Sequence, residues 1–218
     1  MMKNFIISID GPAGSGKQRI SKYIAKKYKF YHLDSGILYR RLTAIIIKKK
    51  IQYEKDLILK QFIKSLNNIS PRNHSSLRKE TIGKISSKIA TIPIIRKYIN
   101  LQQKKIIKNK LNSYTGCVID GRDIGSKVFK EAQIKLFITV NAEIRAKRRH
   151  KQLIAKGEKS IYSKILKDIN LRDYSDKNRM EAPMIVPKGA ITIDNSNNFK
   201  LTTQLIIKVI NKKLCNKI

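Results

Sequence analysis

The amino-acid sequence predicts an α/β fold of three layers, in which helices cover both faces of a mostly parallel central sheet. Two observations lead to this prediction. The apolar run at 6–9 passes directly into a glycine-rich turn at 11–16, and short β-rich segments then alternate with longer helical segments. The chain has 218 residues, 41% of them hydrophobic, and no glycine- or serine-rich linker, so we expect one domain over 1–218.

The first two strands and their following helices form a βαβα unit, the usual beginning of a parallel sheet. Ile20 and Ile24 fall on one face of the first helix. Asp34, Ser35 and Gly36 interrupt the second strand and are expected to cap the next helix, because Asp and Ser accept hydrogen bonds from free N–H groups. We expect strands at 3–10 and 30–33 and helices at 17–28 and 35–47.

The middle of the chain departs from this pattern. Residues 48–79 are polar, weakly periodic and contain Pro71, which indicates an excursion from the sheet into a small subdomain. Pro93 suits the first turn of a helix. The remaining expected elements are helices at 81–90, 93–111, 142–156, 161–178 and 199–214, and strands at 116–119, 134–140 and 190–193.

The glycine-rich turn fits the spacing of a phosphate-binding loop. Gly11 is followed by four residues and then by Gly16-Lys17. Small residues let successive backbone N–H groups surround an oxyanion, and a lysine in this place reaches the β- and γ-phosphates of a nucleotide. Five strands with this loop indicate a P-loop kinase architecture. The expected ATP-binding residues are Gly11, Pro12, Ala13, Gly14, Ser15, Gly16, Lys17, Gln18 and Arg19.

The net charge of +33 allows two interpretations. A strongly basic protein can bind nucleic acid or another anionic surface. Here the lysines are scattered over every segment, and aromatic residues are not interleaved with them as stacking platforms, which favours an unfocused solvated surface. We therefore expect at most nonspecific binding of nucleic acid.

Cysteine and histidine usage points to a reducing compartment. Cys117 and Cys215 form no Cys-x-x-Cys or metal-like pattern, and the three His residues are dispersed, which disfavours a zinc site. Asp10 ends the first apolar run without a cleavage site, and no apolar stretch is long enough to span a bilayer. We expect a cytoplasmic protein without a membrane partner.

Arginine placement narrows the function. The chain strongly prefers lysine, yet arginines stand beside turn residues at the ends of expected elements, where a planar bidentate fork has a use. These arginines are Arg40, Arg96, Arg122, Arg172 and Arg179.

At these positions the sequence resembles the bacterial cytidylate (CMP/dCMP) kinases, in family order along nearly the whole chain. The matching blocks are Ile9 to Lys17, Leu33-Asp34-Ser35-Gly36-Ile37-Leu38-Tyr39-Arg40, Ser87 to Ala90, Pro93 to Arg96, Asp120-Gly121-Arg122-Asp123-Ile124-Gly125, Arg172 to Arg179, Ala182-Pro183 and Ile193 to Ser196. The combination is far more specific than any single block.

The resemblance implies transfer of the γ-phosphoryl group of ATP to the phosphate of CMP or dCMP. The expected catalytic residues are Lys17, Arg40, Arg122 and Arg179. By the same resemblance, Ser87, Arg96 and Asp123 read the cytosine base, and Ser35, Arg172 and Asp176 contact the sugar. A carboxylate can accept a hydrogen bond from the exocyclic amino group of cytosine, where uracil offers a second acceptor. From the residues alone, Asp176 and Arg179 could instead form a surface ion pair.

The family pattern also implies a monophosphate-binding insertion at 48–92 and a short lid over ATP at 148–165. For the basic run of this region, which comprises Arg145, Arg148 and Arg149, an ordinary solvated helix face is an equal alternative. The cofactor implied is Mg²⁺ brought as MgATP, with no direct protein ligand. Gln18 and Arg19 depart from the family, which has a hydroxyl residue there, so we expect weaker positioning of a metal held mainly by ATP oxygens and waters, with a strand-end carboxylate such as Asp10 or Asp120 as an alternative ligand. Lys104 likewise stands where an arginine is usual.

Two alternatives stay open at this point. A kinase for another nucleoside monophosphate would share the loop, although the joint pattern of acceptor residues favours CMP. A degenerate P-loop protein that binds RNA through its charge would explain Gln18, although the acceptor residues are largely intact. No long apolar stripe is left for a partner, so we expect a monomer.

Overall fold

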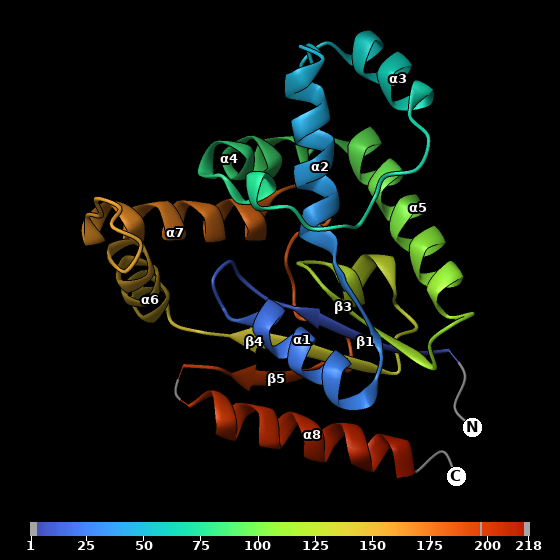
Figure 1. The fold of residues 1–218 in the computed structure, drawn as a ribbon, viewed down its shortest axis with the longest axis vertical. Helices are drawn as coiled ribbons and strands as arrows, with labels where there is room; N and C mark the ends of the chain where they lie inside the picture. The colour runs from blue at the N-terminus through green and yellow to red at the C-terminus, as the bar shows by residue number, and fades with distance from the viewer. Residues whose placement is uncertain (1–3, 197, 216–218) are drawn as a thin grey trace.

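The computed structural model describes residues 4–196 and 198–215, which form a parallel five-stranded sheet between helices (Figure 1). The strand order is β2-β3-β1-β4-β5. The predicted fold class and all five predicted strands are confirmed; Lys3, the expected start of the first strand, lies outside the described residues. The strands are β1 (Phe5–Asp10), β2 (Tyr31–Asp34), β3 (Gly116–Asp120), β4 (Ile134–Thr139) and β5 (Ile191–Asp194).

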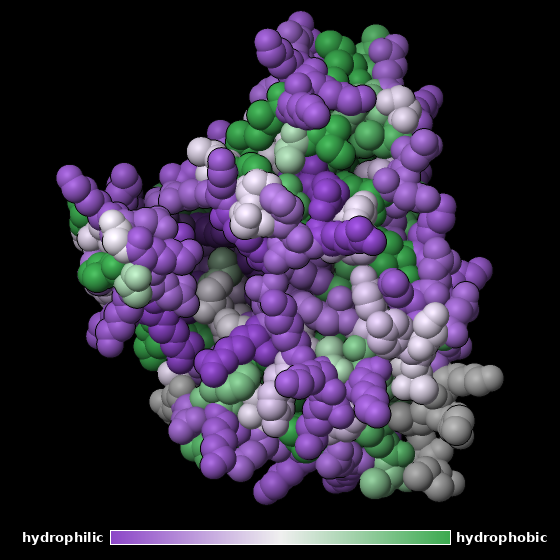
Figure 2. All heavy atoms as spheres, viewed as in Figure 1, coloured by the Kyte–Doolittle hydropathy of each residue, from purple (hydrophilic) through white to green (hydrophobic). Residues whose placement is uncertain are grey.

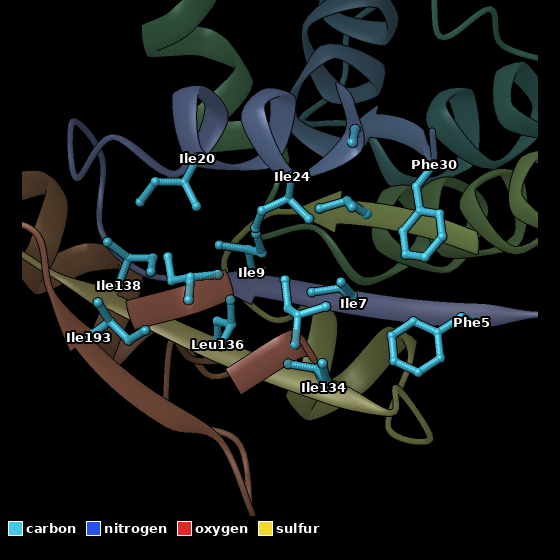
Figure 3. Packing of buried hydrophobic residues seen from close by; sticks show 14 residues of the cluster. Phe5, Ile7, Ile9, Ile20, Ile24, Phe30, Ile134, Leu136, Ile138 and Ile193 are labelled. Carbon is cyan, nitrogen blue, oxygen red and sulfur yellow. The ribbon is translucent and has the colours of Figure 1, made fainter. Parts of the chain in front are cut away.

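The two faces of the sheet are covered by different helices. Ile7 and Ile9 of β1 pack with α1 (Lys17–Tyr28) and α8 (Phe199–Cys215), as Figure 3 shows for the α1 side chains Ile20 and Ile24. In β3, Val118 joins this cluster, whereas Cys117 and Ile119 point to the other face. There α5 (Pro93–Lys110) and the π-helical turn η2 (Ile124–Val128) complete the third layer.

A second apolar core lies away from the sheet. It is formed by α2 (Ser35–Lys48), α3 (Asp56–Ser65), the 3₁₀ turn η1 (Ser75–Arg78), α4 (Glu80–Ile89) and the first half of α5. Leu59, Phe62 and Ile63 are the buried side of α3, a short apolar stripe in a charged stretch. Neither α3 nor η1 was predicted, because so narrow a stripe gives a weak periodicity when the sequence is read alone.

An arm of two helices projects beside these cores. It consists of α6 (Ala142–Ile154) and α7 (Tyr162–Asn178), which lie against each other. No residue of α7 is buried. Figure 2 shows a hollow lined by hydrophilic residues between this arm and the rest of the molecule. In the described ranges, no helix is long and apolar enough to cross a membrane.

The register of the sheet gathers acidic residues at one edge. Asp34 of β2 and Ile9 of β1 both pair with Asp120 of β3, and Asp10 pairs with Phe137 of β4. These residues lie at the carboxyl ends of the parallel strands. Ligands of open α/β sheets bind at this edge, because the connecting loops converge there.

Candidate active site

The glycine-rich turn forms a tight loop between β1 and α1. Gly11 has φ of 140°, and a Cβ atom there would stand 2.2 Å from the carbonyl oxygen of Ile138. Gly16 has φ of 85°, and its own Cβ would meet the side-chain amide of Asn195, which donates to the Ser15 carbonyl at 2.9 Å. Only glycine fits these backbone positions. The loop is therefore shaped as its sequence predicted.

Lys17, the first residue of α1, folds over this loop. Its Nζ donates to the carbonyl oxygen of Pro12 at 2.8 Å. Burial, with the nearby charge of Arg122, lowers the pKa of Lys17 to about 7, although Asp120 and Asp10 oppose the shift. The carboxylates around the amine thus do not compensate the cost of burying its positive charge. Bound phosphate groups would supply the missing negative charge.

Two carboxylates stand at the strand ends behind the loop. Asp10 is buried, and its two oxygens accept from the backbone N–H groups of Ile124 and Gly125 at 2.8 and 2.7 Å. Burial raises the pKa of Asp10 to about 6, against the lowering effect of these hydrogen bonds. Asp120 Oδ1 lies 2.5 Å from Nε2 of His32. Asp10 thereby fixes the start of η2, and both carboxylates are already engaged within the protein.

Arginines converge on the acidic side chain of Asp176 in α7. Arg122 Nε donates to Asp176 Oδ2 at 2.9 Å, and Arg179 Nη1 lies 3.6 Å from Oδ1. The ion pair between Asp176 and Arg179 that the alternative expected is present, but both side chains are largely shielded rather than on the surface. Burial, followed by the charge of Arg122, lowers the pKa of Arg172 to about 10. Its Nε is buried without a hydrogen-bond partner in the described structure.

Arg40 extends this positive cluster from α2. Its Nη1 donates to the carbonyl oxygen of Leu77 at 2.9 Å. Burial and then the charge of Arg78 lower the pKa of Arg40. Guanidinium groups repel one another, and a site that holds several of them is suited to an anion that bonds to more than one.

The predicted base-reading residues meet only in part. Arg96 of α5 and Asp123 form a buried ion pair, and Arg96 Nη1 also donates to the Ala90 carbonyl at 2.9 Å. Arg179 Nη2 stands 3.8 Å from the other oxygen of Asp123. Ser87, in contrast, donates its hydroxyl back to Gly83 in its own helix at 3.1 Å. Ser35 of the predicted sugar set donates to the Asp120 carbonyl at 2.7 Å.

Several residues at this edge were missed or misread in the sequence. Asp34 was expected to cap α2, but its side chain makes no capping hydrogen bond. Instead its Oδ2 accepts from Gln18 Nε2 at 2.8 Å and from Arg78 Nη2 at 2.5 Å. Asp34 is thus the N-cap residue of α2 as expected, but the expected side-chain hydrogen bond is absent, because two side chains distant in sequence occupy the carboxylate. Arg78 carried no signal in a chain so rich in basic residues.

The arm contributes two further arginines. Arg145 of α6 is buried; its Nη1 donates to the Ala13 carbonyl of the loop at 3.0 Å, and its guanidinium pairs with Asp173 of α7. Arg148 Nη2 donates to the carbonyl oxygens of Asn195 and Ser196 at 2.9 and 2.8 Å. Both make specific contacts with loops of the core. For these two, the interpretation as an ordinary solvated helix face is wrong.

Arg19 and the possible metal ligands complete the site. The Arg19 guanidinium stacks on the ring of Phe199, 3.8 Å from its centroid. Within the residues that the structure describes, no group of three or more His, Cys, Asp or Glu side chains is placed to hold a metal ion. Ser15 has a buried hydroxyl without a hydrogen-bond partner. The loop is thus suited to phosphate, and a divalent ion would depend mainly on oxygens that come with the nucleotide.

Comparisons with known proteins agree with this geometry. The family model described as cytidylate kinase matches residues 7–215. A cytidylate kinase of Fusobacterium nucleatum is 36% identical over 225 residues, which cover 98% of this chain and 98% of the relative. That of Rickettsia akari is 39% identical over 217 residues, covering 99% and 94%.

Solved structures support the fold. A crystal structure of a Thermus thermophilus protein superposes with a TM-score of 0.53 at 14% identity, covering 97% of this chain and 98% of that one. A protein of Eubacterium ventriosum gives 0.50 at 18% identity, with 95% and 98% covered. At these identities the likeness concerns the fold alone.

Proposed function

The chain belongs to the cytidylate kinase family and is a nucleoside monophosphate kinase, and from this premise we propose that the site at the carboxyl edge of its sheet transfers the γ-phosphoryl group of ATP to CMP and dCMP. One observation supports the proposal above the others. Asp10, the residue before the phosphate loop, accepts from the amides of Ile124 and Gly125, which directly follow Arg122 and Asp123, so the proposed donor and acceptor residues lie at the same edge of the sheet. Such proximity is what direct transfer between two nucleotides requires.

The chemistry needs alignment and charge neutralisation rather than a general base. A phosphate oxygen of CMP is already anionic and attacks the γ-phosphorus directly. In the proposal the loop N–H groups and Lys17 hold the ATP phosphates. Arg40, Arg122 and Arg179 clamp the CMP phosphate and the moving phosphoryl group, whose charge is spread over its oxygens.

Recognition of the cytosine base and of the sugar is assigned to residues other than the phosphate-binding arginines. Asp123 accepts from the exocyclic amino group of cytosine, and Arg96 donates toward the O2 and N3 side of the ring, with Ser87 adjacent on α4. Ser35, Arg172 and Asp176 contact the sugar. The ion pair of Arg96 with Asp123 supports this assignment, because it holds both side chains in place before the base arrives.

The donor side includes the remaining loop residues and a metal. Mg²⁺ bound together with ATP would neutralise negative charge on the phosphates. Gly11 to Arg19 bind ATP, and segment 148–165, from α6 into α7, is the lid that excludes water. Residues 48–92 form the monophosphate-binding insertion, for which the separate apolar core is the support.

The proposal also specifies the oligomeric state, the compartment and the partners of the enzyme. It works as a monomer in the cytoplasm, with ATP, Mg²⁺ and CMP or dCMP as its partners. Its charge of +33 gives contacts with nucleic acid that are nonspecific and weaken with salt.

A coupled assay on a panel of monophosphates tests the function. With ATP and Mg²⁺, we expect CMP and dCMP to turn over fastest and UMP, dTMP and AMP to be poor acceptors. Fastest turnover with UMP or dTMP would refute the substrate assignment. Absence of turnover with every monophosphate, alongside RNA binding that persists at moderate salt, would favour the degenerate P-loop alternative.

ATP binding should take up a proton at Lys17. At about pH 8 a lysine with a pKa of about 7 is mostly neutral, and the ATP phosphates raise that pKa, so uptake of about one proton is expected. Near pH 6 the lysine is already charged and its uptake falls away. Calorimetric titrations in buffers of different ionisation enthalpy measure the uptake, and Lys17→Met should abolish it. Equal uptake by the variant would contradict the assignment to Lys17.

A further inference from the structure

Gln18 stands in the phosphate loop where the pattern has a hydroxyl residue, and its side chain is committed elsewhere. It is the second residue of α1 and is half-buried. Its Nε2 donates to Asp34 Oδ2 at 2.8 Å. A Ser side chain at this position lacks two chain atoms and could not span the same gap. The glutamine therefore makes a contact that the usual hydroxyl could not make.

Asp34 connects Gln18 to the proposed monophosphate-binding insertion at 48–92, because it also contacts Arg78 there. The same oxygen, Oδ2, also takes the ion pair from Arg78 Nη2 at 2.5 Å. Arg78 is the last residue of η1, two residues before the start of α4. The side chain of Asp34 is only 16% exposed, so loss of a donor there is not simply replaced by bulk water.

A second contact to η1 comes from Arg40, one of the residues proposed to bind the CMP phosphate. Arg40 donates to Leu77, the residue before Arg78, and the charge of Arg78 lowers the pKa of Arg40. Two guanidinium groups therefore stand close together on the acceptor side. The Asp34 carboxylate compensates one of them, and Gln18 fixes where that carboxylate points.

We propose that Gln18 is a positioning residue for the acceptor nucleotide, and that it acts through Asp34 on Arg78. The contacts Gln18–Asp34–Arg78 are called the clasp below. The clasp joins the first turn after the phosphate loop to the turn that precedes α4, so it orders the acceptor insertion before CMP arrives. This inference rests on the proposed function. It differs from a metal role for position 18, because the amide nitrogen that makes the contact donates and cannot ligate a cation.

CMP binding without ATP and without Mg²⁺ separates these roles. Calorimetry of CMP with Gln18→Ser in EDTA should show a dissociation constant raised roughly tenfold, because a hydrogen bond to a charged group is lost. In steady state, KM for CMP should rise while kcat changes much less. The matched control is Gln204→Ser on the exposed face of α8, which should leave both values as in the wild type.

A double-mutant cycle tests the connection through Asp34. Arg78→Gln alone should weaken CMP binding, and adding Gln18→Ser should weaken it by no more than about twofold further, because the clasp is already open. Effects that multiply fully would overturn the proposal, as would an unchanged dissociation constant in Gln18→Ser with a shifted Mg²⁺ dependence. If the folded wild type itself binds no CMP, the proposed function fails and the inference falls with it; binding by the wild type with unaltered variants overturns the clasp alone.

Discussion

Lys17→Met should lower kcat by roughly 10²- to 10³-fold, because it removes the cation proposed to hold the transferring phosphates. The same substitution should leave the fold as stable as before or more stable. Lys17 is buried, its Nζ donates to the Pro12 carbonyl, and burial disfavours its charged form, so the folded protein gains little from this amine. Loss of activity and retention of stability in one variant would separate a functional lysine from a structural one.

The pH dependence of that stability has a definite sign. The pKa of Lys17 in the folded protein, about 7, lies below its value of 10.5 in the unfolded chain. Between these values the unfolded state binds more protons, so Lys17 destabilises the fold fully below about pH 7 and less as the pH rises toward 10.5. Thermal unfolding of Lys17→Met should therefore show its largest gain at the acidic end. Lys22→Met, exposed on the same helix, is the control; wild-type turnover in Lys17→Met would contradict the assignment.

Asp123→Asn should reduce the preference for CMP over UMP by roughly 10- to 100-fold. An Asn side chain can present either an acceptor or a donor, so it no longer penalises the carbonyl of uracil. The substitution also leaves Arg96 buried without its ionic partner, which should cost about 3 kcal/mol of the free energy of unfolding. The ratio of CMP to UMP turnover measures the change in base preference. Chemical unfolding at low temperature measures the change in the free energy of unfolding.

A matched control separates base reading from general damage. Asp173→Asn breaks the pair with Arg145, another largely buried arginine, outside the proposed base site. It should also lower stability while leaving the ratio of CMP to UMP turnover unchanged. If Asp123→Asn left that ratio unchanged as well, base reading would have to be assigned to other residues.

Sequence reading succeeded where a local pattern determines the structure. The five strands and the loop around Gly11 and Gly16 follow from apolar runs, glycine spacing and the short-range rules of βα units. The acceptor residues came from a resemblance, and the structure places Arg122, Arg179 and Asp176 together. Their roles in binding and catalysis remain proposals.

The features that the sequence did not predict depend on contacts between segments that are far apart along the chain. The direction of the Gln18 side chain is set by Asp34 and Arg78, sixteen and sixty residues further along the chain. The π-helical turn at Ile124 is favoured because Asp10 collects two successive amides at its start. Neither interaction produces a periodic pattern of apolar residues. Helix propensity and hydrophobic patterning therefore could not predict them.

The absence of buried residues in α7 has a consequence for the end of each catalytic cycle. A helix that carries side chains proposed for the acceptor site, yet has no buried residue, can separate from the body by breaking a few polar contacts such as Arg122–Asp176. Water would solvate the released charges at once, whereas opening a packed helix would first expose apolar surface. The product can therefore leave through a local opening of the arm, without any loosening of the sheet beneath it.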